Sequence, residues 1–223
     1  MCMNEQLQEI KSHLRRYMNG AVAQSMREKG VVYKMNFGIE LPRIREIASM
    51  YPKEHALAQA LWKENIRECK ILAGLLQPVD SFLPEIADIW VENIHHLEIA
   101  ELTSMNLFQY LPYAPALSLC WIAGEGEYKQ ICGFFTIARL LIRKGDMPER
   151  AANELLDQAV CAALSGNYHL RNAALTAIRC FMQHSEEHAF LVCRRVENLK
   201  DSTTENELWL YAAVADLTEA VKK

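Results

Sequence analysis

The stretch that decides the fold is residues 36–76, which read NFGIELPRIREIASMYPKEHALAQALWKENIRECKILAGLL. Apolar residues recur in it at helical spacing, and prolines at positions 42, 52 and 78 separate the periodic segments. The last segment, residues 67–76, places small Ala73 and Gly74 between its apolar residues. Small residues let the ridges of a neighbouring helix approach closely. This stretch therefore predicts short helices packed in pairs.

The same pattern continues along the chain, with about a dozen helical segments and no strand-like alternation. Small residues followed by leucine recur around Ala73, Gly133 and Ala174, and the last two lie 41 residues apart. That spacing is near the period of HEAT or armadillo units. We predict an all-α, HEAT-like or armadillo-type helical repeat solenoid, with an irregular helical bundle as the alternative. No composition shift marks a domain boundary, so we expect one domain over residues 1–223, with Gly124–Gly126 as the best hinge.

The composition is that of a soluble globular protein, with 51% hydrophobic and 23% charged residues. No apolar run approaches the length of a membrane span, and the first residues have no signal-peptide pattern. The seven cysteines are scattered without Cys-x-x-Cys spacing, which favours reduced, buried thiols. We expect a cytoplasmic, monomeric protein with no membrane association.

The net charge of −4 is unevenly distributed. Residues 1–76 carry twelve Lys/Arg and eight Asp/Glu, whereas residues 77–126 carry seven acids and no base. Residues 127–182 carry seven bases and five acids, and residues 183–223 carry five bases and eight acids. A surface built from the middle block would repel phosphate, and its two flanks would attract it.

Two histidine motifs have metal-binding and polar alternatives. His184-Ser-Glu-Glu-His188 fits the H-x-x-E-H pattern of a zinc peptidase class, but Ser185 has the features of an N-cap residue. The motif would then cross a helix junction, which spoils the ligand geometry, so we expect no metal site. Adjacent histidines 95 and 96 point about 100° apart on a helix and favour a polar turn over a chelate.

Two carboxylates, Glu98 and Glu101, lie one helical turn apart on the same predicted helix face. A like-charge pair in a cleft can raise one pKa and supply a general base. A solvated pair is the simpler alternative.

Basic residues could follow a phosphate backbone along one concave face of stacked helices, or form ordinary solvated faces. They occur in three groups: Arg43, Arg45, Arg67 and Lys70; Lys129, Arg139, Arg143 and Lys144; and Arg171, Arg179, Arg194 and Arg195. The tryptophans Trp62, Trp90, Trp121 and Trp209 fit apolar core positions better than base-stacking platforms.

Several further positions in the first third of the chain form a recognisable set: Phe37-Gly38-Ile39, Pro42, Arg45, Ile47-Ala48, Leu61-Trp62, Glu68 and Leu72-Ala73. At these positions the chain resembles the amino-terminal part of the DNA alkylation repair enzyme family, the AlkD-like HEAT-repeat alkylpurine DNA glycosylases. The resemblance implies that a concave basic surface holds the DNA backbone and that positively charged alkylpurines are excised without a cofactor. It also implies a working segment Trp-Asp-x-x-Asp, followed by an arginine and a second tryptophan in later repeats.

This chain departs from the family pattern at each working position. The segment that matches Trp-Asp-x-x-Asp is Leu97-Glu98-Ile99-Ala100-Glu101, so Leu97 replaces the indole and Glu101 the catalytic aspartate. The arginine segment matches Tyr128-Lys129-Gln130-Ile131, and the later tryptophan falls on Thr176. Moving a carboxylate by about one methylene can cost roughly a hundredfold in rate, and lysine does not replace a bidentate arginine.

The sequence therefore predicts a divergent family member that binds nucleic acid, with glycosylase activity as a doubtful possibility. Glu101 is the expected catalytic residue, supported by Glu98, and Lys129, Arg171 and Arg179 are the expected backbone contacts. The expected partner is double-stranded DNA with alkylated bases. The alternative is a non-enzymatic repeat scaffold for a protein or peptide, favoured by the base-free block 77–126.

Overall fold

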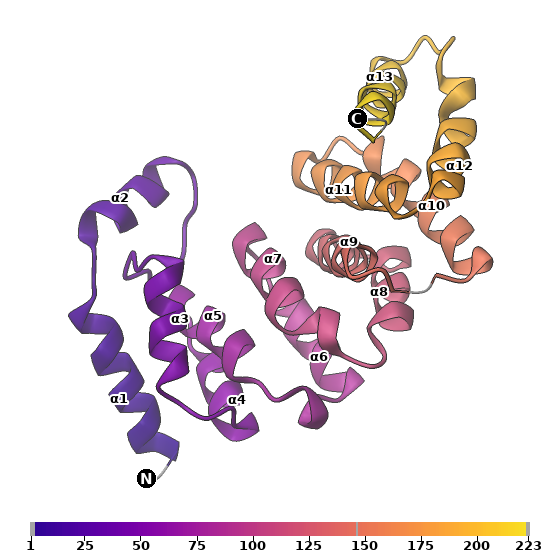
Figure 1. Ribbon diagram of the computed structural model, residues 1–223. Helices are drawn as coiled ribbons and strands as arrows, with labels where there is room; N and C mark the ends of the chain where they lie inside the picture. The colour runs from indigo at the N-terminus through magenta and orange to yellow at the C-terminus, as the bar shows by residue number, and fades with distance from the viewer. Residues whose placement is uncertain (1–2, 146, 222–223) are drawn as a thin grey trace. The chain divides into compact units, whose positions relative to one another are not determined.

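The computed structural model describes residues 3–145 and 147–221 (Figure 1). Within these residues the chain is helical and forms no strand, apart from an isolated parallel bridge between Met35 and Ile66. The all-α prediction is confirmed. The chain divides into two compact units, Met1–Leu111 and Pro112–Lys223, a division that precedes Gly124.

The N-terminal unit contains short helices that begin where the sequence supplies prolines or caps. Asn19 caps α2 through a hydrogen bond from the Val22 N–H, and Pro42 and Pro84 occupy the first turns of α3 and α6. The helices are α1 (Met3–Arg16), α2 (Gly20–Glu28), α3 (Leu41–Ser49), α4 (His55–Lys63), α5 (Arg67–Leu76), α6 (Pro84–Glu92) and α7 (Leu97–Asn106), with 3-10 turns at Val79–Ser81 and Phe108–Tyr110.

The helical spacing of apolar residues predicts one helix over Asp80–Asn93 and another over Glu98–Leu111, and both helices are shorter in the structure. The segment from Asp80 to Asn93 forms a helix only from Pro84 onward, because Leu83 before the proline is held in an extended conformation. The segment from Glu98 to Leu111 is interrupted at Leu107, which has non-helical backbone angles. Both interruptions shorten the helices without changing their order.

Aromatic side chains fill the centre of the N-terminal unit. The rings of Trp62 and Trp90 stack with centroids 3.9 Å apart, and Phe82 meets Trp90 edge to face at 4.9 Å. The Trp90 indole N–H donates to Gln59 Oε1 at 3.1 Å. Trp62, Trp90 and Trp121 are buried, so the prediction of a core role is confirmed for these three.

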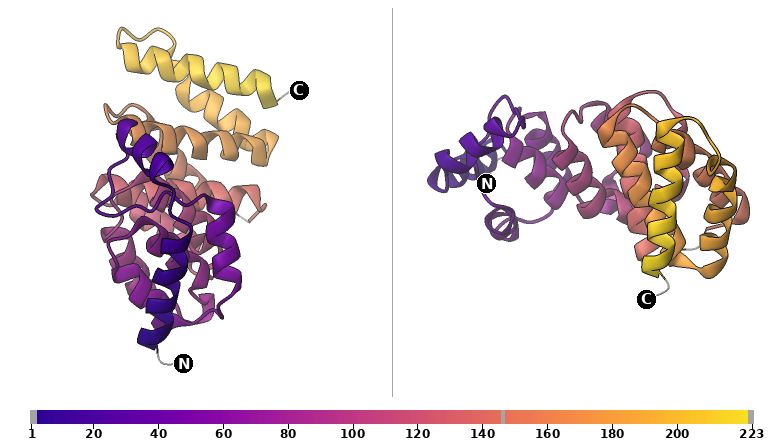
Figure 2. Two further views of the ribbon diagram at one scale, coloured as in Figure 1. Left: turned by 90° about the vertical axis from the view of Figure 1, so that its left-hand side faces the viewer. Right: turned by 90° about the horizontal axis from the view of Figure 1, so that it is seen from above.

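In the C-terminal unit the helices pack on others that are one or two positions away in the order of the chain. Helix α9 contacts α8 and α11, and α11 contacts α10 and α12 (Figure 2). Packing between successive helices is typical of repeat architectures. The helices are α8 (Ala114–Ala123), α9 (Glu127–Ile142), α10 (Glu149–Ala163), α11 (Tyr168–His184), α12 (Glu186–Val196) and α13 (Glu205–Val221), with a 3-10 turn at Glu197–Leu199.

The small residues singled out in the sequence differ in how closely a neighbour approaches. A Cβ added at Gly133 would lie 2.6 Å from Ile122 Cγ1 and 2.8 Å from the Ser118 carbonyl oxygen, so α8 and α9 cross at this glycine. A Cβ at Gly74 would have Thr103 atoms at 3.9 Å, which is ordinary contact.

The two glycines should therefore respond in opposite ways to alanine. We expect Gly133→Ala to lower the free energy of unfolding by about 1–3 kcal/mol through overpacking. Gly74→Ala should leave it unchanged or raise it by up to about 1 kcal/mol, because alanine is the better helix former. Urea unfolding followed by circular dichroism compares them, and an equal loss in both variants would contradict the close crossing at Gly133.

The cysteines only partly match the expectation of buried thiols. Of the six described cysteines, Cys69, Cys132 and Cys180 are buried, but Cys120 and Cys161 are exposed. Cys2 lies outside the described residues. None of the described helices has the length and apolar character needed to cross a membrane.

Candidate functional site

The N-terminal unit contains a buried charged network built on the first turn of α5. Arg67 and Glu68 are 5% and 0% exposed, unusual values for charged residues. Arg67 Nη1 donates to Glu68 Oε1 at 3.0 Å and to the Ile39 carbonyl oxygen at 2.9 Å. Charged groups buried this deeply must be paired and hydrogen-bonded.

Glu68 holds the connection between α2 and α3 against α5. Its two carboxylate oxygens accept hydrogen bonds from the backbone N–H groups of Phe37 and Ile39, at 3.1 and 3.2 Å. Gly38 lies between these two donors with a φ of +71°, a conformation that side-chain-bearing residues rarely adopt. The Phe37-Gly38-Ile39 segment and Glu68 are thus parts of one structural contact.

Glu98, on the first turn of α7, completes the network. It accepts a bidentate pair of hydrogen bonds from Arg67, at 2.8 Å from Nε and 2.6 Å from Nη2, and a third from the Tyr33 hydroxyl at 2.7 Å. Burial opposes ionisation of Glu98, but the hydrogen bonds and charge of Arg67 outweigh it and lower the pKa of this carboxyl. The same burial and the nearby carboxylate raise the pKa of Tyr33.

These contacts bear on the predicted pair of carboxylates. The pKa of Glu98 is lowered and not raised, because its carboxylate pairs with the Arg67 guanidinium and both carboxylate oxygens accept hydrogen bonds from it. Glu101, one turn further along α7, is exposed. Glu98, expected to support catalysis, therefore joins α5 to α7. Glu101, expected to perform catalysis, lies on the surface. A catalytic role for either residue stays a prediction.

The three cations expected to contact DNA lie in the C-terminal unit and are used differently. Arg179 is exposed on α11, and Lys129 is partly exposed on the first turn of α9. Arg171 packs over the Trp209 ring at 4.6 Å and approaches Asn206 Oδ1 at 3.5 Å, so it holds α13 against the start of α11. Arg179 is therefore the most available of the three.

Arg67 fits neither alternative given for its group of basic residues, a phosphate contact or a solvated face. A guanidinium that is 5% exposed and bound to two carboxylates cannot also meet a DNA backbone. The informative signal in the sequence was the charged pair Arg67-Glu68 at the start of a helix that is apolar apart from Lys70. Its partners Tyr33 and Glu98 lie 34 and 31 residues away, and no local pattern connects them.

His184 and His188 lie across the junction that the sequence indicated. Ser185 caps α12 by accepting the His188 N–H, so the motif spans the end of α11 and the start of α12. The two rings stack at 5.0 Å, and His188 also stacks on Phe181 at 4.0 Å. Within the described residues no group of three or more His, Cys, Asp or Glu is placed to hold a metal ion. His95 is exposed, whereas His96 stacks on Tyr33 at 3.9 Å.

The stacked histidines should make stability depend on pH. Burial and the neighbouring His184 lower the pKa of His188, while Glu187 opposes the shift. The unfolded chain therefore binds this proton more readily, and stability present above the ordinary histidine pKa is lost as pH falls below it. Urea unfolding between pH 8 and about pH 5 should show a shallower pH dependence in His188→Gln than in the wild type. Identical slopes would contradict the proposed coupling.

The comparisons with known proteins agree with the fold and place the chain in a family. A family model described as "DNA alkylation repair enzyme" matches residues 10–159, more than half of the chain. The chain belongs to the DNA alkylation repair enzyme family, and the resemblance found in the sequence is confirmed. No curated protein matches the chain.

A solved structure has a similar architecture. It is described as "a new family of proteins related to the HEAT-like repeat DNA glycosylases with affinity for branched DNA structures". The match covers 99% of this chain and 95% of that one, with a TM-score of 0.78 and 13% sequence identity. The predicted HEAT-like helical repeat fold is therefore confirmed.

Proposed function

We propose that this protein binds the DNA backbone, including that of branched DNA, and that alkylpurine excision is not its main activity. The observation that carries the proposal is the state of α7. The segment that the resemblance matches to the family's working residues lies on this helix, but Glu98 is bound by Arg67 and Tyr33 and Glu101 is a surface residue. Membership in the family and the structural likeness to a protein with affinity for branched DNA support the binding half.

The excision half depends on residues that this chain replaces. Stabilising the charge that develops as a cationic base leaves requires a carboxylate and preorganised surroundings at the reacting atoms. Here Leu97 and Thr176 stand where the resemblance places indoles, and the Thr176 hydroxyl donates to the Asn172 carbonyl oxygen of its own helix at 2.8 Å. Lys129 cannot reproduce the fork of an arginine.

The binding proposal is tested with a labelled four-way junction and a duplex of the same sequence, by fluorescence anisotropy over a series of salt concentrations. We expect the junction to bind more tightly and both affinities to fall as salt rises. Arg179→Ala should weaken binding and reduce the salt slope by about 0.9, the contribution of one phosphate contact. Arg150→Ala, which removes an exposed arginine at the start of α10, is the matched control.

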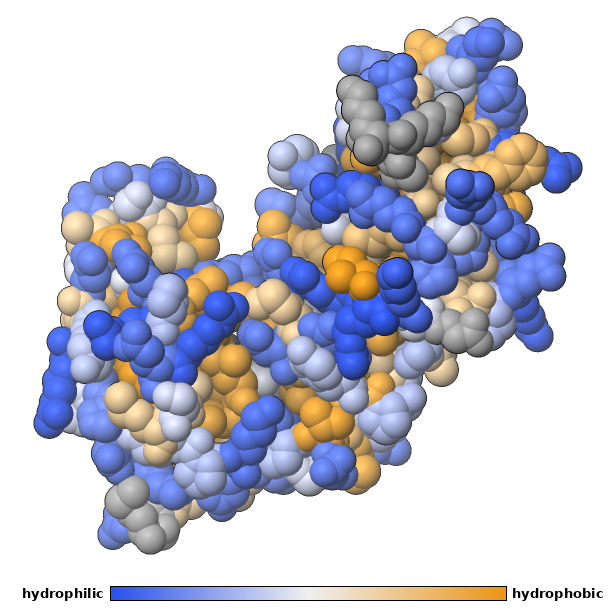
Figure 3. All heavy atoms as spheres, in the orientation of Figure 1, coloured by the Kyte–Doolittle hydropathy of each residue, from blue (hydrophilic) through white to orange (hydrophobic). Residues whose placement is uncertain are grey.

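Negligible binding of either DNA at low salt would overturn the proposal. That result would favour the alternative, a scaffold for a protein or peptide. The base-free block 77–126 favours such a scaffold, but on the face drawn in Figure 3 apolar residues form small separate patches among hydrophilic ones. Docking surfaces for proteins usually present a larger continuous apolar area.

The enzymatic half is tested by release of 7-methylguanine from methylated duplex DNA at stoichiometric protein. We expect no more release from the wild type than from Glu101→Ala, because the surrounding indoles and arginine are replaced. Release that depends on Glu101 would contradict this expectation and would assign the catalytic role predicted for that residue.

A further inference from the structure

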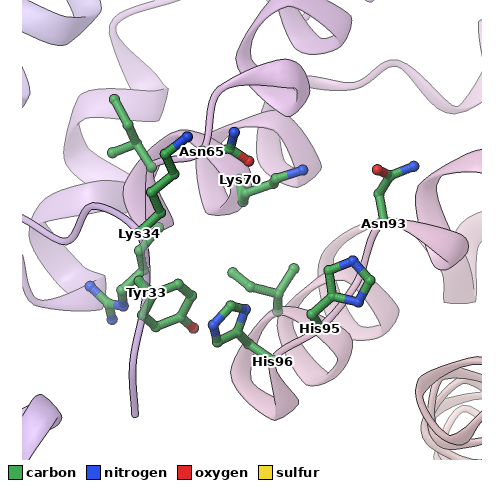
Figure 4. A pocket seen from close by; sticks show the side chains of 10 residues that line it. Tyr33, Lys34, Asn65, Lys70, Asn93, His95 and His96 are labelled. Atoms are coloured by element: carbon green, nitrogen blue, oxygen red, sulfur yellow. The ribbon is translucent and has the colours of Figure 1, made fainter.

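The N-terminal unit has a polar pocket beside the charged network, at the starts of α5 and α7. Its volume is about 140 Å³, and eight of its ten lining residues carry polar or basic side chains, among them Lys34, Asn65, Lys70, Asn93, His95 and His96. In Figure 4 the side chains of Lys70, Asn93 and His95 border one open space, with Lys34 and Asn65 on its other side. We call this the α5–α7 pocket.

The α5–α7 pocket is cationic. None of its lining residues is an aspartate or a glutamate. Within the described part of the chain, neither Lys34 nor Lys70 forms an ion pair, whereas nearby Lys11 pairs with Glu64 and Arg67 with Glu98. The two unpaired ammonium groups and two imidazoles that line this pocket make it an electrostatic site for an anion.

Lys70 has the most to gain from an anion. Its Nζ lies 4.3 Å from the centre of the Trp62 ring, a favourable but weak contact for a cation. Partial burial without a carboxylate partner lowers the pKa of Lys70 to about 8. The α7 carboxylate, Glu98, is already engaged by Arg67 and therefore does not compensate this charge.

The remaining polar groups suit a tetrahedral oxyanion. Asn65 and Asn93 contribute side-chain amides to the pocket. The Asn93 amide donates one N–H to the Ile89 carbonyl oxygen at 2.8 Å, which leaves its second N–H for a ligand. The pocket is smaller than the roughly 300–1,000 Å³ of sites for drug-sized molecules, so it fits a small charged group and excludes a whole nucleotide.

We propose that the α5–α7 pocket binds a dianionic phosphate group, and that the source of this group is the terminal phosphate of a DNA strand. The second part rests on the proposed DNA binding. A terminal phosphate carries close to two negative charges near neutral pH, which matches two lysines, whereas each phosphodiester of the backbone carries one. A terminal group also enters a small pocket without the chain having to leave it on the other side.

The first experiment tests the pocket without DNA, using inorganic phosphate as the probe. The histidine ring signals of the full chain are followed by NMR during a phosphate titration at constant ionic strength, with His95→Gln to assign one of them. We expect a saturable shift of the His95 signal. Lys70→Gln and Lys34→Gln should abolish it, and Lys63→Gln, which removes an exposed lysine at the end of α4 outside the pocket, should keep it.

The second experiment identifies the source of the phosphate. Anisotropy compares one labelled single-stranded oligonucleotide with a 5′-phosphate or a 5′-hydroxyl end, and we expect about tenfold tighter binding of the phosphorylated strand. Lys34→Gln and Lys70→Gln should remove the preference, and Lys63→Gln should retain it. Lys34 is exposed, so its variant keeps the test valid even if Lys70→Gln disturbs the packing on Trp62.

The outcomes separate this inference from the proposed function. Equal binding of both strands, or a preference that survives both pocket variants, overturns the terminal-phosphate site and leaves DNA binding intact. No binding of either strand, together with a phosphate-induced shift of His95, overturns DNA binding and supports the pocket. No shift with phosphate overturns the pocket itself.

Discussion

Replacing Arg67 by methionine should lower the free energy of unfolding by about 3–5 kcal/mol, a large share of the stability of an ordinary domain. Methionine fills similar space but leaves the completely buried Glu68 with only two backbone donors for its charge. It also leaves Glu98 with the Tyr33 hydroxyl in place of a bidentate guanidinium. Near-ultraviolet circular dichroism during urea unfolding reports on this unit, because the stacked Trp62 and Trp90 lie in it.

Two companion variants show whether the uncompensated charge causes the loss. Glu98→Gln keeps the pair between Arg67 and Glu68 and removes the partly exposed charge that Arg67 and Tyr33 bind, so we expect a smaller loss of about 1.5–3 kcal/mol. Adding Glu68→Gln to Arg67→Met should recover part of the stability, since it removes the buried charge. A double variant no more stable than Arg67→Met would show that packing, and not charge, dominates at this site.

Alanine at Gly38 is expected to be about as harmful, for a different reason. The new Cβ would lie 2.2 Å from the Asn19 carbonyl oxygen and 2.7 Å from the Ala23 amide nitrogen, both backbone atoms that cannot turn aside. The left-handed conformation adds about 1–2 kcal/mol, and overpacking about 1–3 kcal/mol. Together these predict a loss of about 2–5 kcal/mol, measured by urea unfolding.

Gly30 supplies a matched control for this prediction. It has a similar φ of +82°, but a Cβ there would meet no atom within 4 Å. Gly30→Ala should therefore cost only the conformational part, about 1–2 kcal/mol. Equal losses of stability in the two variants would show that the close approach of α2 does not cause the loss at Gly38. The closely packed contact of this segment would then be contradicted.

These stability predictions also bear on function, because the network lies where the family's chemistry is expected. If Glu98 contributes mainly by joining α5 to α7, Glu98→Gln should lower stability and leave DNA affinity unchanged after correction for folded protein. Loss of the preference for a phosphorylated end in Lys34→Gln, without loss of stability, would assign recognition to the α5–α7 pocket. The two roles, support and recognition, would then belong to adjacent but different side chains.

Local patterns in the sequence determined much of this protein. Apolar spacing and proline positions set the order of the helices, and Ser185 and Asn19 mark helix starts because capping is a contact between near neighbours. The set of positions from Phe37 to Ala73 was enough to indicate the family. The apolar spacing around the tryptophans at 62, 90 and 121 indicated that they lie in the core. Small residues favoured close helix crossings at both Gly74 and Gly133, and the structure shows a close approach at Gly133 but not at Gly74.

Only the tertiary structure decided which charges are buried and which face solvent. The adjacent Arg67 and Glu68 are a local signal of a charged pair, but nothing in the local sequence shows that Arg67 pairs with a second carboxylate and that Lys70, three residues later, pairs with none. Burial of a charge is stable only when partners arrive from distant segments, here from Tyr33, Ile39 and Glu98. Because those distances along the chain follow no period, the network and the cationic pocket beside it become visible only once α5, α7 and the segment before α3 have packed together.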